Sequence, residues 1–160
     1  MIDVNRLRML DAWQQCQRHL HHLMHALIAL QPHIPMSAAT VANLSDEVVQ
    51  DWDQFILRFT KLQDTMGSKL YPAVLTHLQE PYDDRPMLDK LNRLEKLGYL
   101  SSMTVWQSLR VIRNEFAHDY PDDDALKAAT LNQAVEAVSV LKHLLDRVQP
   151  VISAAQTVVE

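Results

Sequence analysis

The sequence predicts an all-α protein, an up-and-down antiparallel four-helix bundle with one additional short helix. Apolar residues recur at spacings of three and four along almost the whole chain, which is the period of an amphipathic helix. No segment alternates apolar and polar residues as a half-buried strand would, and no repeat of solenoid length is present. With 160 residues the chain fits a single domain, which we place at residues 1–150, followed by a flexible tail at 151–160.

The first helix is predicted over about residues 3–31, because one apolar stripe steps along it by three and four residues. Pro32 and Pro35 end the pattern, and small residues continue to Leu44. The stripe consists of Leu7, Leu10, Trp13, Cys16, Leu20, Leu23, Leu27 and Leu30.

The second helix is predicted to begin at Ser45, whose hydroxyl is suited to cap the free amide groups of a first turn. Gly67 is expected to stop or bend this helix, while Pro72 can open a continuation beyond it. The apolar positions are Val48, Trp52, Phe55, Phe59, Leu62 and Met66.

Three further helices follow a surface turn at residues 80–86. A short one begins near Met87 and is closed by Gly98. The next is capped by Ser101 or Ser102 and ends near residues 119–120, because Pro121 disfavours the α conformation in the residue before it. The last begins among the acidic residues 122–124, which complement the helix dipole, and runs to Pro150.

Composition excludes several classes of protein. Lys and Arg number 15 against 20 Asp and Glu, so the net charge of −5 argues against a protein that coats nucleic acid, and any RNA contact must be local. Two glycines, both outside any phosphate-loop pattern, rule out Walker and Rossmann sites. A lone Cys16, no secretory signal and no apolar run long enough to span a bilayer lead us to expect a cytoplasmic protein without a membrane anchor.

The segment from Arg110 to Tyr120 is chemically unusual. On a helical wheel with Leu109 at zero, the core face holds the apolar residues Val105, Ile112 and Phe116. One flank beside it carries two guanidiniums, an amide and an imidazole, at about 40°, 100°, 140° and 180° of rotation at 100° per residue. These groups are, in that order, Arg113, Arg110, Asn114 and His118.

This flank has two interpretations. Asn114 and His118 are four residues apart and can hydrogen-bond, whereas Arg113 and His118 are about 140° apart. Arg113 therefore meets His118 only by reaching across the flank, or when a second copy of the helix packs by a twofold axis and gathers two Arg and two His in one cleft. We take the twofold packing as the working geometry. The alternative is that an Arg and a His near a helix end only stabilise its dipole.

The motif Arg113-Asn114-x-x-x-His118-x-Tyr120 resembles the R-N-x-x-x-H-x-Y signature of the HEPN superfamily, specifically the HepT-like toxins that are paired with minimal nucleotidyltransferase antitoxins. The segments 55–67 and 94–98 also look like family segments, and the bundle layout agrees. The first helix and the connection with the prolines match the signature least.

The resemblance implies the toxin of a two-gene toxin–antitoxin system. This toxin would be a homodimer whose composite cleft is an endoribonuclease that needs no metal or cofactor and leaves a 2′,3′-cyclic phosphate. Arg113 and His118 are carried over as catalytic, with Asn114 and Arg110 in support. Tyr120 is implied to accept AMP from the cognate nucleotidyltransferase, which would block the cleft.

The residue types suit this chemistry. Cleaving RNA without a metal requires a base for the ribose 2′-hydroxyl, an acid for the leaving oxygen and fixed positive charge at the phosphorus. His118 in a last helical turn can serve near neutral pH, and Arg113 offers a fork for phosphate oxygens. The rival interpretation is a non-catalytic bundle that binds a nucleotidyltransferase and helps present its substrate, which the net charge of −5 suits equally well.

Other groups are interpreted as structural. His21 and His25 are four residues apart and could share zinc, but without a third ligand a polar helix face is favoured. The acidic residues at 83–84 and 122–124 are assigned to turns and helix capping rather than to magnesium. Cys16 is expected in the core. Trp106 is expected to anchor the core, with stacking of an RNA base as the alternative.

Overall fold

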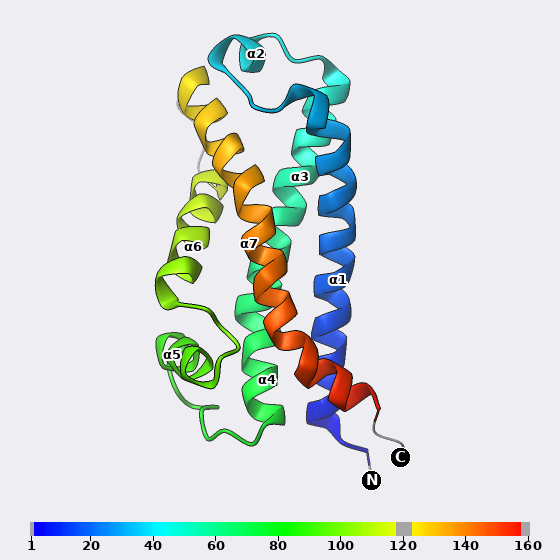
Figure 1. Cartoon of the computed structure of the whole chain (residues 1–160), viewed down its shortest axis with the longest axis vertical. Coiled ribbons are helices and arrows are strands. Elements are labelled where there is room, and N and C mark those ends of the chain that lie inside the picture. Colours follow the sequence, from blue (N-terminus) through cyan, green and yellow to red (C-terminus); the bar gives the residue numbers. More distant parts are fainter. Residues whose placement is uncertain (1, 118–122, 158–160) are drawn as a thin grey trace.

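The computed structural model describes residues 2–117 and 123–157, and all regular structure in these ranges is helical, which confirms the predicted all-α class. The long helices run up and down along one axis, and short elements connect them (Figure 1). In chain order the α-helices are α1 (Val4–Leu30), α2 (Ala38–Ala42), α3 (Asp46–Thr65), α4 (Tyr71–His77), α5 (Met87–Leu97), α6 (Met103–Ala117) and α7 (Asp124–Gln156). Within the described ranges no helix combines the length and apolar character needed to cross a membrane.

Helix α1 begins at a side-chain cap, because the carboxylate of Asp3 accepts a hydrogen bond of 3.1 Å from the amide of Arg6. It ends at Leu30, and a 3-10 turn, Gln31–His33, carries Pro32. Cys16 is fully buried, and this burial raises the pKa of its thiol to about 12. The expectation that Cys16 is a core residue is confirmed.

The connection after α1 is more ordered than its sequence suggests. Ser37 and Thr40 cap the short helix α2 reciprocally, a signal that the sequence analysis missed. The side chain of Asn132 on α7 also accepts a hydrogen bond from the amide of Met36 at 2.8 Å and donates one to its carbonyl oxygen at 2.9 Å. The connection is therefore fixed to α7 across 96 residues of sequence.

Helices α3 and α4 form one continuous rod, so Gly67 is not a stop. Ser45 caps α3 as predicted, and the helix passes into a π-helical turn, Met66–Leu70, before α4 begins. A Cβ atom on Gly67 would lie 3.0 Å from the indole of Trp106 on α6. The glycine is needed for this close approach rather than for a helix end.

The termini of α5 and α6 agree with the sequence signals. Gly98 ends α5 in the left-handed conformation, with φ of 89°, and the amide of Tyr99 bonds to the carbonyl of Leu94 at 2.9 Å. Ser102 caps α6 by accepting a hydrogen bond of 3.0 Å from the amide of Val105. Helix α6 is described to Ala117, so its predicted end near residues 119–120 lies outside the described residues.

Asp123 caps helix α7 as predicted, but the helix does not end at Pro150. It continues through the proline to Gln156, and Val151 and Ile152 are buried. The prediction of a flexible tail is therefore wrong for residues 151–156. Proline removes one intrahelical hydrogen bond, and here the apolar residues beyond it stabilise the helix by packing into the core.

The core lies between α1, the α3–α4 rod and α7, while α6 packs at the edge of the bundle (Figure 1). On α6 only Trp106 and Leu109 are buried. Val105, Ile112 and Phe116, which the wheel placed on a core face, are only partly buried because α6 is at this edge.

Candidate functional site

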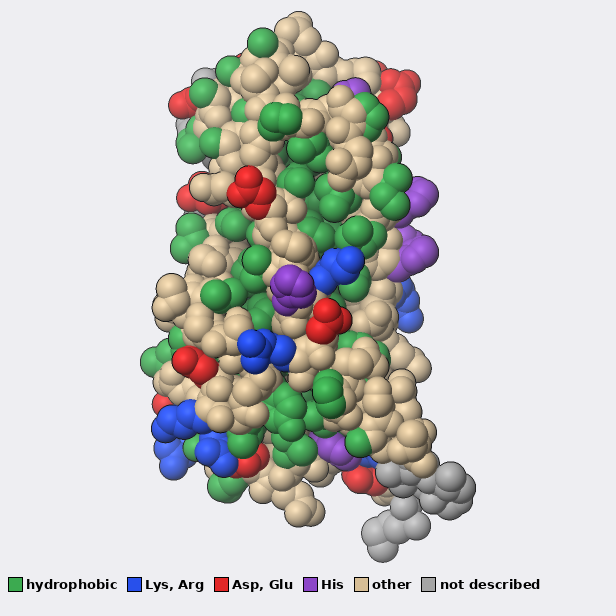
Figure 2. Space-filling model, viewed as in Figure 1, with side chains coloured by type: hydrophobic (Ala, Val, Ile, Leu, Met, Phe, Trp, Pro, Cys, Tyr) green, Lys and Arg blue, Asp and Glu red, His purple; other side chains and the backbone are tan. Residues whose placement is uncertain are grey.

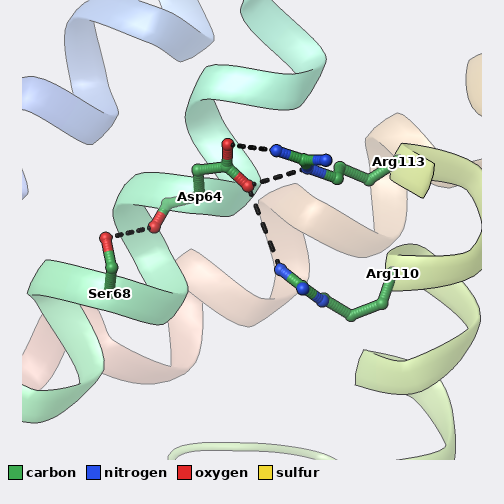
Figure 3. Close-up of polar contacts among 4 residues, drawn as sticks. All are labelled: Asp64, Ser68, Arg110 and Arg113. Atoms are coloured by element: carbon green, nitrogen blue, oxygen red, sulfur yellow. Dashed lines mark hydrogen bonds and ion pairs between the residues drawn. The ribbon is translucent and has the colours of Figure 1, made fainter. Parts of the chain in front are cut away.

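The candidate site is centred on an ion pair between α6 and α3. The guanidinium of Arg113 donates from Nε to Oδ1 of Asp64 at 3.0 Å and from Nη2 to Oδ2 at 2.9 Å, the two-point geometry that suits a carboxylate (Figure 3). The side chains are 26% and 36% exposed. These hydrogen bonds raise the pKa of Arg113, and its partial burial opposes the effect. Asp64 therefore fixes the plane in which the guanidinium lies.

Arg110 approaches the same carboxylate from one turn earlier on α6. Its Nη1 atom is 3.9 Å from Oδ1 of Asp64, and its side chain is 47% exposed (Figure 3). Arg110 and Arg113 therefore lie on one flank, as the helical wheel indicates. Among the residues that the structure describes, these two guanidinium groups share a single carboxylate, which leaves one positive charge in excess at this point.

The π turn holds the backbone that carries Asp64. The hydroxyl of Ser68 donates a hydrogen bond of 2.7 Å to the carbonyl oxygen of Asp64 (Figure 3). Turns of this kind are rare and occur often at functional sites, because the extra residue re-aims the side chains around it. Here the π turn, the carboxylate and both arginines lie together.

A groove of about 720 Å³ opens beside the ion pair, between α3, the π turn, α5 and α6. Its lining combines the polar groups of the ion pair, Ser68 and Gln107 with apolar side chains of α5 and α6. The lining residues are Asp64, Gly67, Ser68, Met87, Leu88, Leu91, Met103, Trp106, Gln107, Arg110 and Arg113. Such a groove suits a ligand that carries both an anionic group and a flat apolar group.

Trp106 belongs to the floor of this groove. It is 3% exposed, and its ring packs edge-to-face on Tyr71 with 5.3 Å between centroids. The expectation that Trp106 anchors the core is confirmed. Because its faces are covered, stacking of a base on this ring finds no support.

The other predicted site residues are only partly described. Asn114 is exposed on α6, and its side chain has no hydrogen bond to any residue in the described ranges. His118 and Tyr120 lie outside the described residues. The proximity of Arg113 to His118 and the contact between Asn114 and His118 therefore stay predictions.

Asp64 is the site residue that sequence reasoning missed. The sequence analysis included it only as part of the segment 55–67, which resembles a segment of the HEPN family. Nothing in the nearby sequence signals this role, because the partner Arg113 is 49 residues away on another helix.

The histidines of α1 do not assemble with other ligands. His21 and His22 pack edge-to-face with 5.2 Å between ring centroids, and His19 instead contacts Arg58 of α3. Within the residues that the structure describes, no group of three or more His, Cys, Asp or Glu side chains gathers as a metal site would require.

Comparison with known protein families, with curated proteins and with solved structures finds no match to this chain. Its functional interpretation therefore depends on the motif in the sequence and on the geometry of the groove.

Proposed function

We propose that this chain is a metal-independent endoribonuclease and acts in the cytoplasm as the toxin of a two-gene toxin–antitoxin system. The observation that carries the proposal is the convergence of Arg110 and Arg113 at the edge of the groove. These arginines belong to the same α6 segment that leads into Asn114 and His118, the motif that resembles the HEPN signature.

The paired state of Arg113 is compatible with binding a phosphate. A guanidinium has five N–H groups, and Asp64 accepts from two of them, which leaves three. Asp64 can therefore orient the guanidinium of Arg113 while the N–H groups on the Nη1 side of that guanidinium donate to phosphate oxygens. Arg110, half exposed, adds a second positive charge that stabilises the dianionic phosphorane.

In this proposal His118 and its copy in a homodimer supply the proton transfers. One imidazole removes the proton of the ribose 2′-hydroxyl, and the 2′-oxygen attacks the phosphorus. The bond to the 5′-oxygen breaks, and that oxygen takes a proton from the other imidazole. The products are a 2′,3′-cyclic phosphate and a free 5′-hydroxyl.

An exposed apolar surface on α6 supports the homodimer. Val111 is 60% exposed, and it lines a shallow groove with Ile112 of α6 and Ala137 and Val140 of α7. Covering this apolar surface with a second copy of α6 would stabilise a dimer. On the helical wheel Val111 is about 160° from Arg113, so this packing would bring the two α6 helices together while each Arg113 faces its own groove on another side of the helix.

The proposed antidote is AMP transfer to Tyr120 by the cognate nucleotidyltransferase. A nucleotide on this side chain would add bulk and negative charge two residues from His118 and repel the RNA phosphates. Intact-mass measurement after co-expression with the enzyme should show whole AMP units, which peptide mapping should place on Tyr120. No mass increase, or an increase mapped elsewhere, contradicts this control.

Purified protein tests the activity directly. It should cut a single-stranded RNA in the presence of a chelator and leave the all-deoxy strand intact, because the 2′-hydroxyl is the nucleophile. Arg113→Ala and His118→Ala should each remove cleavage and growth inhibition while circular dichroism stays unchanged. Arg85→Ala is the matched control, since Arg85 is an exposed arginine that pairs with Asp89 and not with Asp64. Cleavage of DNA, or a need for added magnesium, would overturn the mechanism.

The second candidate is a non-catalytic partner that binds a nucleotidyltransferase and presents its substrate. The two-point pairing of Arg113 with Asp64 favours it, since holding α6 on α3 is a sufficient role for such a pair without any bound phosphate. Expression of the chain alone separates the two candidates. A toxin arrests growth without its neighbour, whereas a presenting subunit does not.

A further inference from the structure

A second positively charged surface lies on the face shared by α1 and α3, away from the ion pair at Asp64. Histidine and basic side chains gather along the edge of the molecule that α1 forms (Figure 2). We name this surface the basic patch. It consists of Arg18, His19 and His22 of α1 with Arg58 and Lys61 of α3.

The two helices are joined within the patch by a contact between a guanidinium and an imidazole. Nη1 of Arg58 lies 3.0 Å from Nδ1 of His19. Since a guanidinium only donates, Nδ1 accepts and the ring is neutral with its proton on Nε2. Burial and the charges of Arg58, Lys61 and Arg18 lower the pKa of His19. The pKa of His22 is also lowered, by desolvation and by the charges of Arg58, the neighbouring histidines and Arg18.

The cations of the patch have no acidic partner in the described part of the chain. Arg18, Arg58 and Lys61 form no ion pair there, whereas Arg85, Arg93, Arg110 and Arg113 each contact a carboxylate. The Nε atom of Arg58 is buried and also lacks a hydrogen-bond partner within those residues. In a chain with a net charge of −5, this is a local excess of positive charge.

The patch is continuous with the groove through α3. Lys61 stands three residues before Asp64, which places the two side chains about one turn apart on the helix surface. Arg58 stands six residues before Asp64, a distance of about 9 Å along the helix axis. A strand that leaves the groove across α3 therefore meets Lys61 first and then Arg58 with His19.

We propose that the basic patch binds the phosphates of the RNA strand on one side of the cleaved bond. Lys61, Arg18 and Arg58 supply positive charge, and the Nε2–H of His19 supplies a neutral donor. This inference rests on the proposed ribonuclease function for the identity of the ligand. It adds that the substrate is a strand several nucleotides long, whose flanking phosphates contribute binding energy outside the cleft.

The test measures binding of a 20-nucleotide 2′-O-methyl RNA, which cannot be cleaved through the 2′-oxygen, by fluorescence anisotropy at several salt concentrations. Arg18→Gln/Lys61→Gln changes two exposed residues and should leave the fold intact. We expect affinity to fall about tenfold or more at low salt and the salt slope to fall by about 1.4, since each phosphate contact on a single strand contributes about 0.7. Lys96→Gln/Lys142→Gln removes the same charge from exposed positions on α5 and α7 and should change affinity less than about twofold.

Cleavage kinetics separate this inference from the proposed function. A dinucleotide substrate is too short to reach the patch, so Arg18→Gln/Lys61→Gln should cut it as the parent does. With the long RNA, the KM of this variant should rise while its kcat stays unchanged. Equal binding by the patch and control variants overturns the inference and leaves the ribonuclease standing. If the parent protein cuts no RNA but the patch variant still binds RNA more weakly than the control variant, the patch is supported and the proposed ribonuclease function is wrong. Unchanged RNA binding with lost binding of the nucleotidyltransferase would assign the patch to a protein partner instead.

Discussion

Helices α6 and α7 are held in the fold in different ways. Of the 33 residues of α7, 13 are buried, whereas only 2 of the 15 residues of α6 are. Helix α7 is stabilised by the core along its whole length, even beyond Pro150. Helix α6 depends on Trp106, Leu109, the edge-to-face contact of Phe116 with Phe59 and the ion pair to Asp64. The candidate site therefore lies on the helix that the core holds least, where polar groups can serve both fold and function.

The largest expected difference between the two helices is in the cost of removing an apolar side chain. Leu141→Ala on α7 empties a fully buried position and should lower the free energy of unfolding by about 3 kcal/mol. Ile112→Ala on α6, which is half buried, should lower it by about 1 kcal/mol. Urea unfolding of both variants checks the ranking. Equal losses would mean that α6 is as much part of the core as α7.

The next largest loss of stability is expected at the contact between α6 and the π turn. Gly67→Val places a branched side chain where a Cβ atom alone would be 3.0 Å from the indole of Trp106, so it should cost about 2 kcal/mol. Ser68→Thr is the matched control, because Ser68 is exposed in the same turn and threonine adds a branched side chain while it keeps the hydroxyl, so the change should cost less than about 1 kcal/mol. If Gly67→Val unfolds at the same urea concentration as Ser68→Thr, Trp106 does not hold α6 in place.

A smaller loss of stability is expected at the ion pair. Asp64→Asn removes the negative charge from a partly exposed pair and should cost about 1 kcal/mol. It also leaves the charges of Arg110 and Arg113 uncompensated, so it should tighten the binding of 2′-O-methyl RNA. A loss of about 3 kcal/mol with unchanged RNA affinity would instead assign Arg113 to the fold alone, as the second candidate function requires.

The smallest effect on folding is expected at the exposed apolar residue of α6. Val111→Ser should change the free energy of unfolding of the monomer by less than about 0.5 kcal/mol, because Val111 is 60% exposed. It should nevertheless weaken the proposed homodimer, which analytical ultracentrifugation measures. Val49→Ser on α3, another partly exposed valine, is the control that should leave association unchanged. An unaltered dimer in Val111→Ser would place the interface on another surface.

The features that the sequence predicted correctly are those with local causes. Ser45, Gly98 and Asp123 act on backbone groups within a few residues, so the helix ends beside them could be read from the chain. The capping of α2 by Ser37 and Thr40 is a local signal that was missed. The other missed features depend on distant residues, because Asn132 fixes the connection at Met36 and Trp106 sets the course of the chain at Gly67. Neither contact has a signal in the nearby sequence.

The same distinction applies to the site. The flank of α6 that carries Arg110 and Arg113 follows from helical periodicity, and the structure places both at one groove. Their shared partner Asp64 is 49 residues from Arg113, and spacing within one helix does not predict which element will face it. The functional assignment of His118 and Tyr120 comes from the resemblance alone.

The π turn at Met66–Leu70 also constrains how the chain can vary in length. It contains an additional residue relative to an ordinary helical turn and takes up that residue within about one rotation, so deleting one residue there would restore regular helix and leave α4 in about its present rotation. Tyr71, Val74 and Leu75 would then stay buried. Deleting one residue from the regular helix of α3 would instead rotate everything that follows by about 100°.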